Sequence, residues 1–510
     1  MNEEIAEYYE ELYRLYIDEN QPLERRYRQL RESLERVVRE RIQGNSLQTT
    51  DLAARINYVA TQYGLDIKEQ NQLHTFRLTS NDILNHRKFP AKEEFLRDLR
   101  AVAFAYRKMF AQDIPLKLFS VLPKQEITSL GKKEKKEYIR RIRVCFDYAD
   151  DTYLYVHPVD IIADEPIRVV YNKPGINHEF EETIKELWRY AQLNLLDVFV
   201  DREGIYTPSF IVLEPDYLID ISSLAECYKD YGSHPANYFL SRLVPIDNAR
   251  PLLLGNIANL FLDEWIHAGE EEPDYIDCMK KAFRQYPIEL AACAELRDPS
   301  KEKEFAKDCR MHFEHIRDIV QHTFLEPGYN LDKKDAVLEP SYICEALGIQ
   351  GRLDYMQRDM SSFIEMKSGK ADEFSIQGKV EPKENNKVQM LLYMAVLEYS
   401  MGQDRRRMHP YLLYTRYPLL YPARASWAQV RRVINLRNRI VAAEYGVQFH
   451  NHSDFTRNLL PQINPEVVNE RKLSGRFWEQ YLKPSISRFR EKLSALEPLE
   501  QAYFYTLYNF

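Results

Sequence analysis

The sequence lacks the marks of a secreted or membrane-spanning protein. It has no N-terminal apolar stretch like a signal peptide and no run of about 18 apolar residues. Its six cysteines include no C-x-x-C pair, which disfavours both a zinc site and a disulfide framework. We therefore expect a cytoplasmic protein with buried, reduced thiols and no membrane partner.

A phosphate-binding loop is also absent from the sequence. No G-x-x-x-x-G-K-[ST] motif occurs, so we expect no ATP site in this chain. The formal net charge is −8, from 70 Lys and Arg against 78 Asp and Glu, and this balance gives no overall signal of nucleic-acid binding. A local basic track within an acidic surface remains compatible with phosphate binding, which depends on local charge density.

Three short sequences between Gly351 and Tyr393 carry most of the chemical information. They are GRLDY (351–355), IEMKSGK (364–370) and QMLLY (389–393). The apolar run SFIEMK predicts a strand, in which Glu365 and Lys367 share one face. If a neighbouring strand brings Asp354 alongside, two carboxylates lie beside one lysine.

These residue types suit metal-assisted hydrolysis of a phosphodiester. Asp354, Glu365 and the main-chain carbonyl of Met366 offer the oxygen ligands that Mg²⁺ or Mn²⁺ takes, with waters completing the shell. Lys367 can hold the attacking water or stabilise charge on the scissile phosphate. Each piece alone has an ordinary explanation, because Glu-x-Lys is usual on a solvated strand face and Asp near Gly is usual in a turn.

Taken together, the motifs resemble a known family. The order G-x-x-D, then E-x-K on an apolar strand, then Q-x-x-x-Y on a helix resembles the RecB-like branch of the PD-(D/E)XK nuclease superfamily. Gln389 and Tyr393 share one face of a helix that the apolar spacing predicts from Asn385 to Tyr399. The resemblance implies an α/β fold with a restriction-endonuclease-like core, in which helices flank a mixed sheet.

The resemblance covers about residues 213–445 and is closest to the nuclease module of Okazaki-fragment-processing nuclease–helicases. Outside the three motifs it rests on LEPDYLIDISSLAEC (213–227), LLLGNIANLFLDEWI (252–266), LEPSYICEALGIQGRLD (338–354) and LRNRIVAAEY (436–445). It implies a deoxyribonuclease that acts on single-stranded DNA ends or flaps in repair, replication or defence, with Gln389 and Tyr393 holding the DNA backbone. It also implies a helicase partner, in trans or fused.

Two departures from the family pattern bear on the cofactors. Asn259 replaces the usual histidine of the L-G-x-x-x-H helix and is a weaker ligand than imidazole. Asp263, four residues further on, either supplies a carboxylate from the same helical face or lies on the surface of an amphipathic helix. Relatives often hold an iron–sulfur cluster on four cysteines, but no cysteine follows Cys344, so Cys227 lacks partners and we expect no cluster.

Aromatic and basic residues follow the third motif in YLLYTRYPLLYPAR (411–424). Arg416 and Arg424 are the candidates to hold phosphates, and the interleaved tyrosines can stack bases. Half-buried packing in a strand is the more common explanation of alternating tyrosines. We predict DNA contacts for the two arginines and leave the tyrosines open.

Four regions are expected along the chain. Residues 1–113 predict a helical region, with apolar residues at helical spacing among mixed charges. Residues 114–212 predict a β-rich domain with one helix at about 179–196. Residues 213–450 form the expected nuclease domain and residues 451–510 a C-terminal helical segment. Its aromatic stretch 495–510 either contacts a motor protein or folds back onto the N-terminal helices.

Two other functions share some of these features. A nuclease-derived DNA-binding scaffold, catalytically weak because of Asn259, is opposed by the intact Asp354, Glu365 and Lys367. A site-specific duplex restriction enzyme has the same core but usually lacks Q-x-x-x-Y. We therefore expect a Mg²⁺- or Mn²⁺-dependent deoxyribonuclease.

Overall fold

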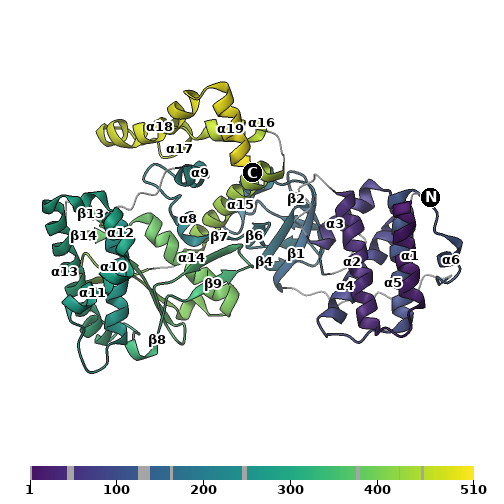
Figure 1. The fold of residues 1–510 in the computed structure, drawn as a ribbon, viewed down its shortest axis with the longest axis horizontal. Helices are drawn as coiled ribbons and strands as arrows, with labels where there is room; N and C mark the ends of the chain where they lie inside the picture. The colour runs from purple at the N-terminus through teal and green to yellow at the C-terminus, as the bar shows by residue number, and fades with distance from the viewer. Residues whose placement is uncertain are drawn as a thin grey trace. The chain divides into compact units, whose positions relative to one another are not determined.

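The computed structural model divides into two compact units (Figure 1). The first unit comprises Met1–Glu214, Val441–Thr456 and Thr506–Phe510, and the second Pro215–Ile440 and Arg457–Tyr505. Both units contain helices and sheets, so the chain is mixed α/β, as the sequence predicts. The structure describes residues 3–42, 51–123, 138–160, 165–243, 250–374, 379–423, 426–449 and 453–509.

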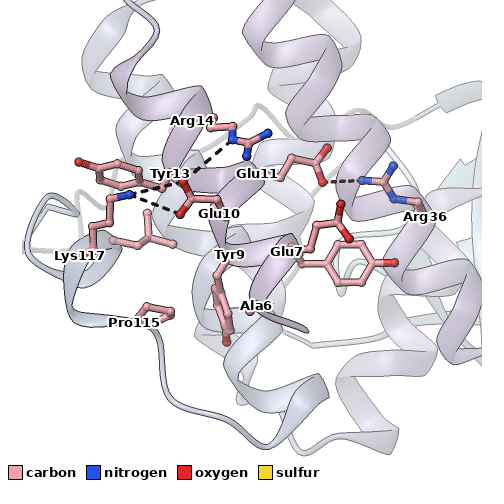
Figure 2. Close-up of a pocket in the computed structure, with 12 residues that line it drawn as sticks. Ala6, Glu7, Tyr9, Glu10, Glu11, Tyr13, Arg14, Arg36, Pro115 and Lys117 are labelled. Carbon is pink, nitrogen blue, oxygen red and sulfur yellow. Dashed lines mark hydrogen bonds and ion pairs between the residues drawn. The ribbon is translucent and has the colours of Figure 1, made fainter. Parts of the chain in front are cut away.

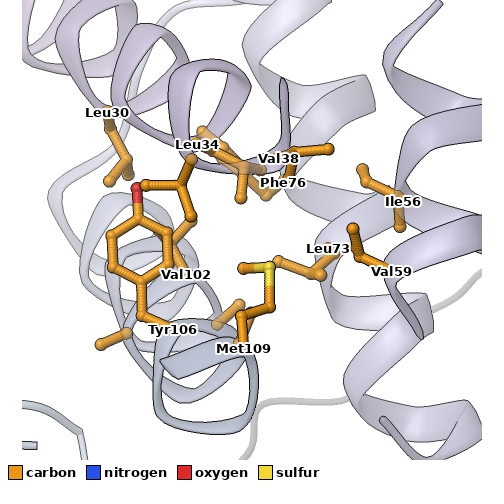
Figure 3. Close-up of a cluster of buried hydrophobic side chains, with 14 of the residues drawn as sticks. Leu30, Leu34, Val38, Ile56, Val59, Leu73, Phe76, Val102, Tyr106 and Met109 are labelled. Atoms are coloured by element: carbon orange, nitrogen blue, oxygen red, sulfur yellow. The ribbon is translucent and has the colours of Figure 1, made fainter. Parts of the chain in front are cut away.

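Helices make up the first part of unit 1. They are α1 (Glu3–Ile17), α2 (Leu23–Arg41), α3 (Leu52–Gln62), α4 (Ile67–Leu84), α5 (Lys92–Phe110) and α6 (Leu116–Phe119). Leu30, Leu34 and Val38 recur every four residues on α2 and are fully buried. Figure 3 shows them packed with Phe76 of α4 and Tyr106 of α5. One apolar stripe on each helix therefore builds this core.

A small barrel follows these helices in the first unit. Its strands are β1 (Tyr138–Ala149), β2 (Tyr153–Pro158), β3 (Ile167–Val170), β4 (Gln192–Val200), β5 (Tyr206–Thr207) and β6 (Phe210–Leu213). They pair in the order β1-β2-β3-β5-β4, and a further pairing of β1 with β4 closes the ring, while β6 pairs with β4. The β3–β5 pair is parallel and the other pairs are antiparallel.

The helix expected at 179–196 is wrong in its second half. A short helical segment, η2 (His178–Phe180) with α7 (Glu181–Lys185), ends well before Gln192, where β4 begins. Leu193 and Leu195 of β4 pair with Val144 and Ile142 of β1 and are fully buried. Pairing across the barrel therefore decides the conformation of a segment whose local sequence suits either structure.

A mixed sheet of five strands forms the centre of unit 2. Its order is β16-β15-β12-β11-β8, from the strands β8 (Ala336–Leu338), β11 (Tyr355–Gln357), β12 (Ser362–Lys367), β15 (His409–Tyr414) and β16 (Leu419–Pro422). The neighbours β8, β11 and β12 run antiparallel, and β12 runs parallel to β15. The helix α14 (Glu384–Met401) lies between β12 and β15 in the chain, as parallel strands require a long connection.

Helices cover both faces of this sheet. On one face, α10 (Arg250–His267) and α13 (Pro299–Gln321) share a core with Ile364 and Met366 of β12. On the other face, Asn386 of α14 donates a hydrogen bond of 2.6 Å to the hydroxyl of Tyr414 on β15. Alternate residues of β12 therefore face two different helical layers, and Glu365 and Lys367 face α14.

Two glycines allow close packing next to the sheet. A second, three-stranded sheet pairs β7 (Ile219–Asp220), β10 (Ile349–Arg352) and β9 (Ser341–Cys344). A side chain at Gly351 would come within 3.1 Å of the ring of Tyr393. Gly348 has a φ of +64°, and a side chain there would overlap the guanidinium of the fully buried Arg437. Position 348 therefore needs glycine, and position 351 has little room for a side chain.

The remaining named elements complete unit 2 and the C-terminal part of the chain. They are α8 (Ile221–Ala225), α9 (Ala236–Leu243), α11 (Tyr275–Gln285), α12 (Pro287–Ala292), β13 (Asp372–Phe374), β14 (Lys379–Glu381), α15 (Trp427–Phe449), α16 (Ser453–Leu459), α17 (Pro465–Val468), α18 (Lys483–Ser494) and α19 (Pro498–Asn509). All six cysteines are buried, as expected. Within the described ranges, no helix is both long and apolar enough to cross a membrane.

Candidate active site

The site begins where the pairing of β11 with β12 stops. The two strands pair at Tyr355 with Ile364 and at Met356 with Phe363. Asp354 precedes β11, and its Oδ2 accepts a hydrogen bond of 2.6 Å from the main-chain N–H of Met366. A side chain thus takes the place of the next backbone partner and fixes the Asp354 carboxylate beside Glu365, as the sequence predicts.

Glu365, Lys367 and Gln389 form a closed set of hydrogen bonds. Lys367 Nζ lies 2.9 Å from Glu365 Oε1 and 2.8 Å from Gln389 Oε1. Gln389 Nε2 donates to the same Glu365 oxygen at 2.6 Å. The shared strand face and the α14 face predicted from the sequence are therefore both observed. Gln389 orients the other two side chains from the first half of α14.

One oxygen of this set has no partner among the residues that the structure describes. Glu365 is only 4% exposed, and its Oε2 is buried without a hydrogen bond to any of them. A buried carboxylate oxygen without a donor is costly, because it has lost its water shell and gained nothing in return. A cation at this oxygen would supply the missing interaction.

The carbonyl of Met366 points towards the same edge. The N–H and C=O of one strand residue point to the same side, and the N–H of Met366 bonds Asp354. The carbonyl of Lys367 points to the opposite side, where it accepts a 3.0 Å hydrogen bond from the N–H of Thr415 after β15. Asp354, Glu365 and the Met366 carbonyl can therefore serve one cation at the β11 edge of β12.

The electrostatics of the site match this arrangement. Burial and the nearby Asp354 raise the pKa of Glu365 to about 8. Burial also raises the pKa of Asp354. Burial opposes the charge on Lys367, but Glu365 outweighs that effect and raises the lysine pKa. Two acids and one ammonium thus share a poorly solvated space, as in sites that hold a metal or move protons.

The helix α10 brings a third carboxylate near the pair. Burial raises the pKa of Asp263 to about 6, and Glu339 and Asp354 contribute to the rise. Asn259 lies one turn before Asp263 on the same helical face and is partly exposed. Asp263 is partly exposed, and its role stays a prediction with two alternatives, a metal-binding carboxylate or a surface acid on an amphipathic helix.

Two acidic residues near the site escaped the sequence interpretation. Glu339 holds a positive φ of 49°, and its N–H donates to the carbonyl of Asp354 at 3.1 Å. Glu226 follows α8 and lies close enough to Lys367 to interact with its charge. Both lie in segments on which the family resemblance rests, 213–227 and 338–354, but no local spacing links them to the three motifs. Only the unusual backbone at Glu339 sets it apart.

The predicted DNA-contacting residues fall into three classes. Tyr393 is 2% exposed and donates a 2.6 Å hydrogen bond to the carbonyl of Arg352. Arg416 is partly exposed. It follows Thr415 just after the end of β15, next to the end of β12 at Lys367. Arg424 lies outside the described residues. Tyr393 thus holds the end of β10 through a hydrogen bond. Of the two arginines predicted to contact DNA, Arg416 is the one that the structure describes, and it lies near Lys367.

The tyrosines of β15 belong to the core. Tyr411 and Tyr414 are buried, and the hydroxyl of Tyr414 accepts hydrogen bonds from the N–H of Lys383 and the amide of Asn386. Base stacking on these two rings is therefore excluded, and the packing explanation holds for them.

A metal cage built wholly from side chains is not observed. In the part of the chain that the structure describes, no group of three or more His, Cys, Asp or Glu side chains is placed to hold an ion. The donor set that fits is smaller: two carboxylates, one main-chain carbonyl and solvent. Mg²⁺ commonly binds through one or two carboxylates and keeps several waters, so this set suits a hard cation.

A hollow on the N-terminal helices is a separate feature of unit 1. It has a volume of about 930 Å³ and is lined by α1 together with Arg36 and Lys117 (Figure 2). Its charges pair with one another, Arg36 with Glu11 and Lys117 with Glu10. Among the described residues that line it, none has a buried polar atom without a hydrogen bond, so we assign the hollow no chemistry.

Comparison with known proteins supplies no evidence on function, which therefore has to come from the residues of the site. No protein-family model matches the chain, and a search of characterised proteins found no match.

The raised pKa of Glu365 predicts a pH-dependent gain in stability for Glu365→Gln. Between pH 4.5, the ordinary value, and about 8, the unfolded chain releases this proton while the folded chain keeps it. The wild-type protein therefore loses stability as pH rises through this window, and the glutamine variant lacks the share of that loss that Glu365 causes. Thermal unfolding without metal should favour the variant by more than about 1 kcal/mol at pH 8 relative to pH 5.

The exposed Glu491 provides the matched control. Glu491→Gln should shift unfolding equally at both pH values. An equal effect of pH on the wild type and Glu365→Gln would show that the buried carboxyl does not titrate as described.

Proposed function

We propose that this chain is a metal-dependent nuclease that hydrolyses phosphodiester bonds in DNA. The observation that carries the proposal is the unpartnered, buried Oε2 of Glu365 beside Asp354, with Lys367 held next to both. Two buried carboxyl groups beside one lysine lower the free energy of unfolding, so stability alone does not explain this arrangement. It becomes useful when a divalent cation and a phosphate are bound there.

The order of elements in unit 2 supports a restriction-endonuclease-like core. A helical layer with α10 and α13 precedes the antiparallel strands β8, β11 and β12, and α14 and the parallel strand β15 follow. The acidic residues lie where β11 and β12 separate, and the Q-x-x-x-Y helix packs over β12. A mixed sheet flanked by helices is what the resemblance to PD-(D/E)XK nucleases implies.

The roles of the residues follow from their contacts. Asp354, Glu365 and the Met366 carbonyl would hold the cation, and Asp263 and Asn259 lie on the helix that could complete the site with or without bridging waters. A bound Mg²⁺ or Mn²⁺ supplies Lewis-acid polarisation of the phosphate and a more acidic water. Lys367, held by Glu365 and Gln389, stabilises the negative charge that develops on the phosphoryl oxygens. Arg416 holds a neighbouring phosphate of the strand.

Single-stranded ends or flaps are the proposed substrates, and a helicase is the proposed partner. Both come from the resemblance. The helix α19 leaves Leu499, Tyr503 and Leu507 exposed by 83%, 67% and 56% of their surfaces. Tyr505 is buried and packs against Arg457 of α16. One side of α19 is thus anchored, and the other could meet a motor protein.

A second candidate is a DNA-binding scaffold without catalysis. The observation in its favour is Asn259, which stands where relatives carry a metal-binding histidine. The two candidates differ in one measurable property, because the scaffold binds DNA and leaves it intact.

Removal of the lysine or the central acid should abolish cleavage. Glu365→Ala and Lys367→Ala are expected to lower the rate of Mg²⁺- or Mn²⁺-dependent digestion of end-labelled single strands and flaps by about 10³-fold or more. DNA binding should persist, because folding does not require either side chain. Blocked-end circles in the same assay separate endonucleolytic from end-dependent cleavage.

Lys387→Ala is the matched control, because Lys387 lies on α14 but pairs at the surface with Glu381. It should digest DNA at the wild-type rate. Digestion at the wild-type rate by Glu365→Ala would remove the carboxylate from the mechanism. No digestion by the wild-type protein with any divalent cation would favour the scaffold.

Asn259→His should change the metal preference of the reaction. Imidazole suits Mn²⁺ better than Mg²⁺, which prefers oxygen ligands. The ratio of the digestion rates in Mn²⁺ and Mg²⁺ is therefore expected to rise in this variant, while the substrate preference stays the same. Asn256→His, a partly exposed neighbour on α10, serves as the control. An unchanged ratio in Asn259→His would show that this position does not reach the cation.

A further inference from the structure

A row of three side chains crosses the outer surface of the barrel in unit 1. Tyr148 of β1 pairs with Tyr155 of β2, and Tyr155 pairs with Arg168 of β3. Residues directly opposite one another on neighbouring strands project from the same face of a sheet. The three strands therefore present tyrosine, tyrosine and arginine side by side.

A β-bulge sets the direction of this row. The pairing of β1 with β2 skips Asp147, between Phe146 and Tyr148. Without the bulge, Tyr148 would follow Phe146 onto the inner face, because residues two apart share a face. Phe146 is buried, whereas Tyr148 is 50% exposed. The bulge therefore turns an aromatic ring from the core towards solvent.

The rings already form a stacking surface. Tyr148 and Tyr155 stack with ring centroids 4.2 Å apart and an angle of 12° between their planes. Tyr153 of β2 lies edge-on to Tyr155 at 6.5 Å. The guanidinium of Arg168, an exposed residue, lies 5.6 Å from the centre of the Tyr153 ring. Flat aromatic faces beside a cation are the equipment with which proteins bind single-stranded nucleic acid.

Two acidic residues beside the row, Asp147 and Asp150, are already engaged. Asp147 forms an ion pair with Arg189, with 2.9 Å between Asp147 Oδ1 and Arg189 Nε. Asp150, in the turn between β1 and β2, accepts hydrogen bonds from the N–H groups of Thr152 and Tyr153 and from the hydroxyl of Tyr155. Internal donors therefore satisfy both carboxylates, and Arg168 is the cation at the end of the row that a phosphate can meet.

The topology of the barrel agrees with this use of its surface. Five strands in the closed order 1-2-3-5-4, with β3 parallel to β5 and a helical segment between β3 and β4, have the connectivity of the OB fold. That fold uses the face of its second and third strands to bind oligonucleotides or oligosaccharides. The row lies on those strands and on β1. Fold alone does not assign a ligand, but the side chains do.

We propose that Tyr148, Tyr153, Tyr155 and Arg168 form a binding site for single-stranded nucleic acid on the barrel. A base stacks on the exposed ring of Tyr148, the partly exposed rings of Tyr153 and Tyr155 extend the surface, and Arg168 contacts a phosphate. The site is separate from the acidic site on β12 and does not depend on the nuclease proposal, because binding here needs no metal.

Binding is measured with the full chain in EDTA, so that no probe is hydrolysed. The probes are fluorescent oligo(dT) and oligo(rU) of about 15 nucleotides and a duplex of equal length. Tyr148→Ala combined with Tyr155→Ala should weaken single-strand binding by about 10-fold or more, and the double phenylalanine variant should bind as the wild type does. Comparison of oligo(dT) with oligo(rU) tells DNA from RNA.

Two further measurements keep the test independent of folding. Oligo(dT) carrying 5-iodouracil should crosslink to Tyr148, Tyr153 or Tyr155 in the wild-type chain, as mass spectrometry would show. Arg168→Ala should reduce the slope of log affinity against log salt by about 0.7, the value for one phosphate contact on a single strand. Phe89→Ala removes an aromatic ring that is 93% exposed between α4 and α5, and it should change neither measurement.

Unchanged affinity in a folded Tyr148→Ala, Tyr155→Ala variant would overturn the proposal, as would crosslinks confined to other residues. Equal affinity for the duplex would also contradict it, because stacked base pairs cannot reach the rings. Binding of an oligosaccharide in place of the oligonucleotides would assign the surface to another ligand.

Discussion

The buried carboxylate of Glu365 is the constraint on which the candidate site depends. It lies on a central strand with β11 and β15 on either side and α14 above it, where water cannot solvate its charge. Lys367 and Gln389 satisfy one oxygen, and none of the described residues donates to the other. Burial of an incompletely paired acid lowers stability, so the fold holds this group at a cost that ligand binding can offset.

The surrounding structure maintains that arrangement. Asp354 can stand beside Glu365 because β11 begins only at Tyr355, which frees the N–H of Met366 to bind the Asp354 side chain. Gly351 lets the chain pass against Tyr393, whose hydroxyl holds the carbonyl of Arg352. The helix α10 places Asp263 within electrostatic reach of Asp354. Strand ends and helix faces, rather than loops, thus position the acids, and such positions are the more rigid ones.

The sequence predicts those parts of the structure that follow from local periodicity. The shared face of Glu365 and Lys367 follows from the two-residue period of a strand, and α14 contains the whole helix expected from Asn385 to Tyr399. Long-range pairing was beyond such reasoning. Gln192–Leu196 form a strand because β1 pairs with them, and Tyr148 faces outward because of a bulge that no local spacing reveals. Glu339 and Glu226 lie near the site only because the fold brings distant parts of the chain together. Arg437 is wholly buried against Gly348, which local spacing does not reveal either.

The most direct test of the central claim is a calorimetric titration of the metal-free protein with Mn²⁺. The wild-type chain is expected to show a saturable site whose heat reflects proton release, because Glu365 must ionise to bind a cation. Glu365→Gln and Asp354→Asn should each remove that site while the fold, followed by circular dichroism, remains. Wild-type binding of Mn²⁺ by both variants would contradict the account, since the cation would then lie somewhere other than the edge of β12.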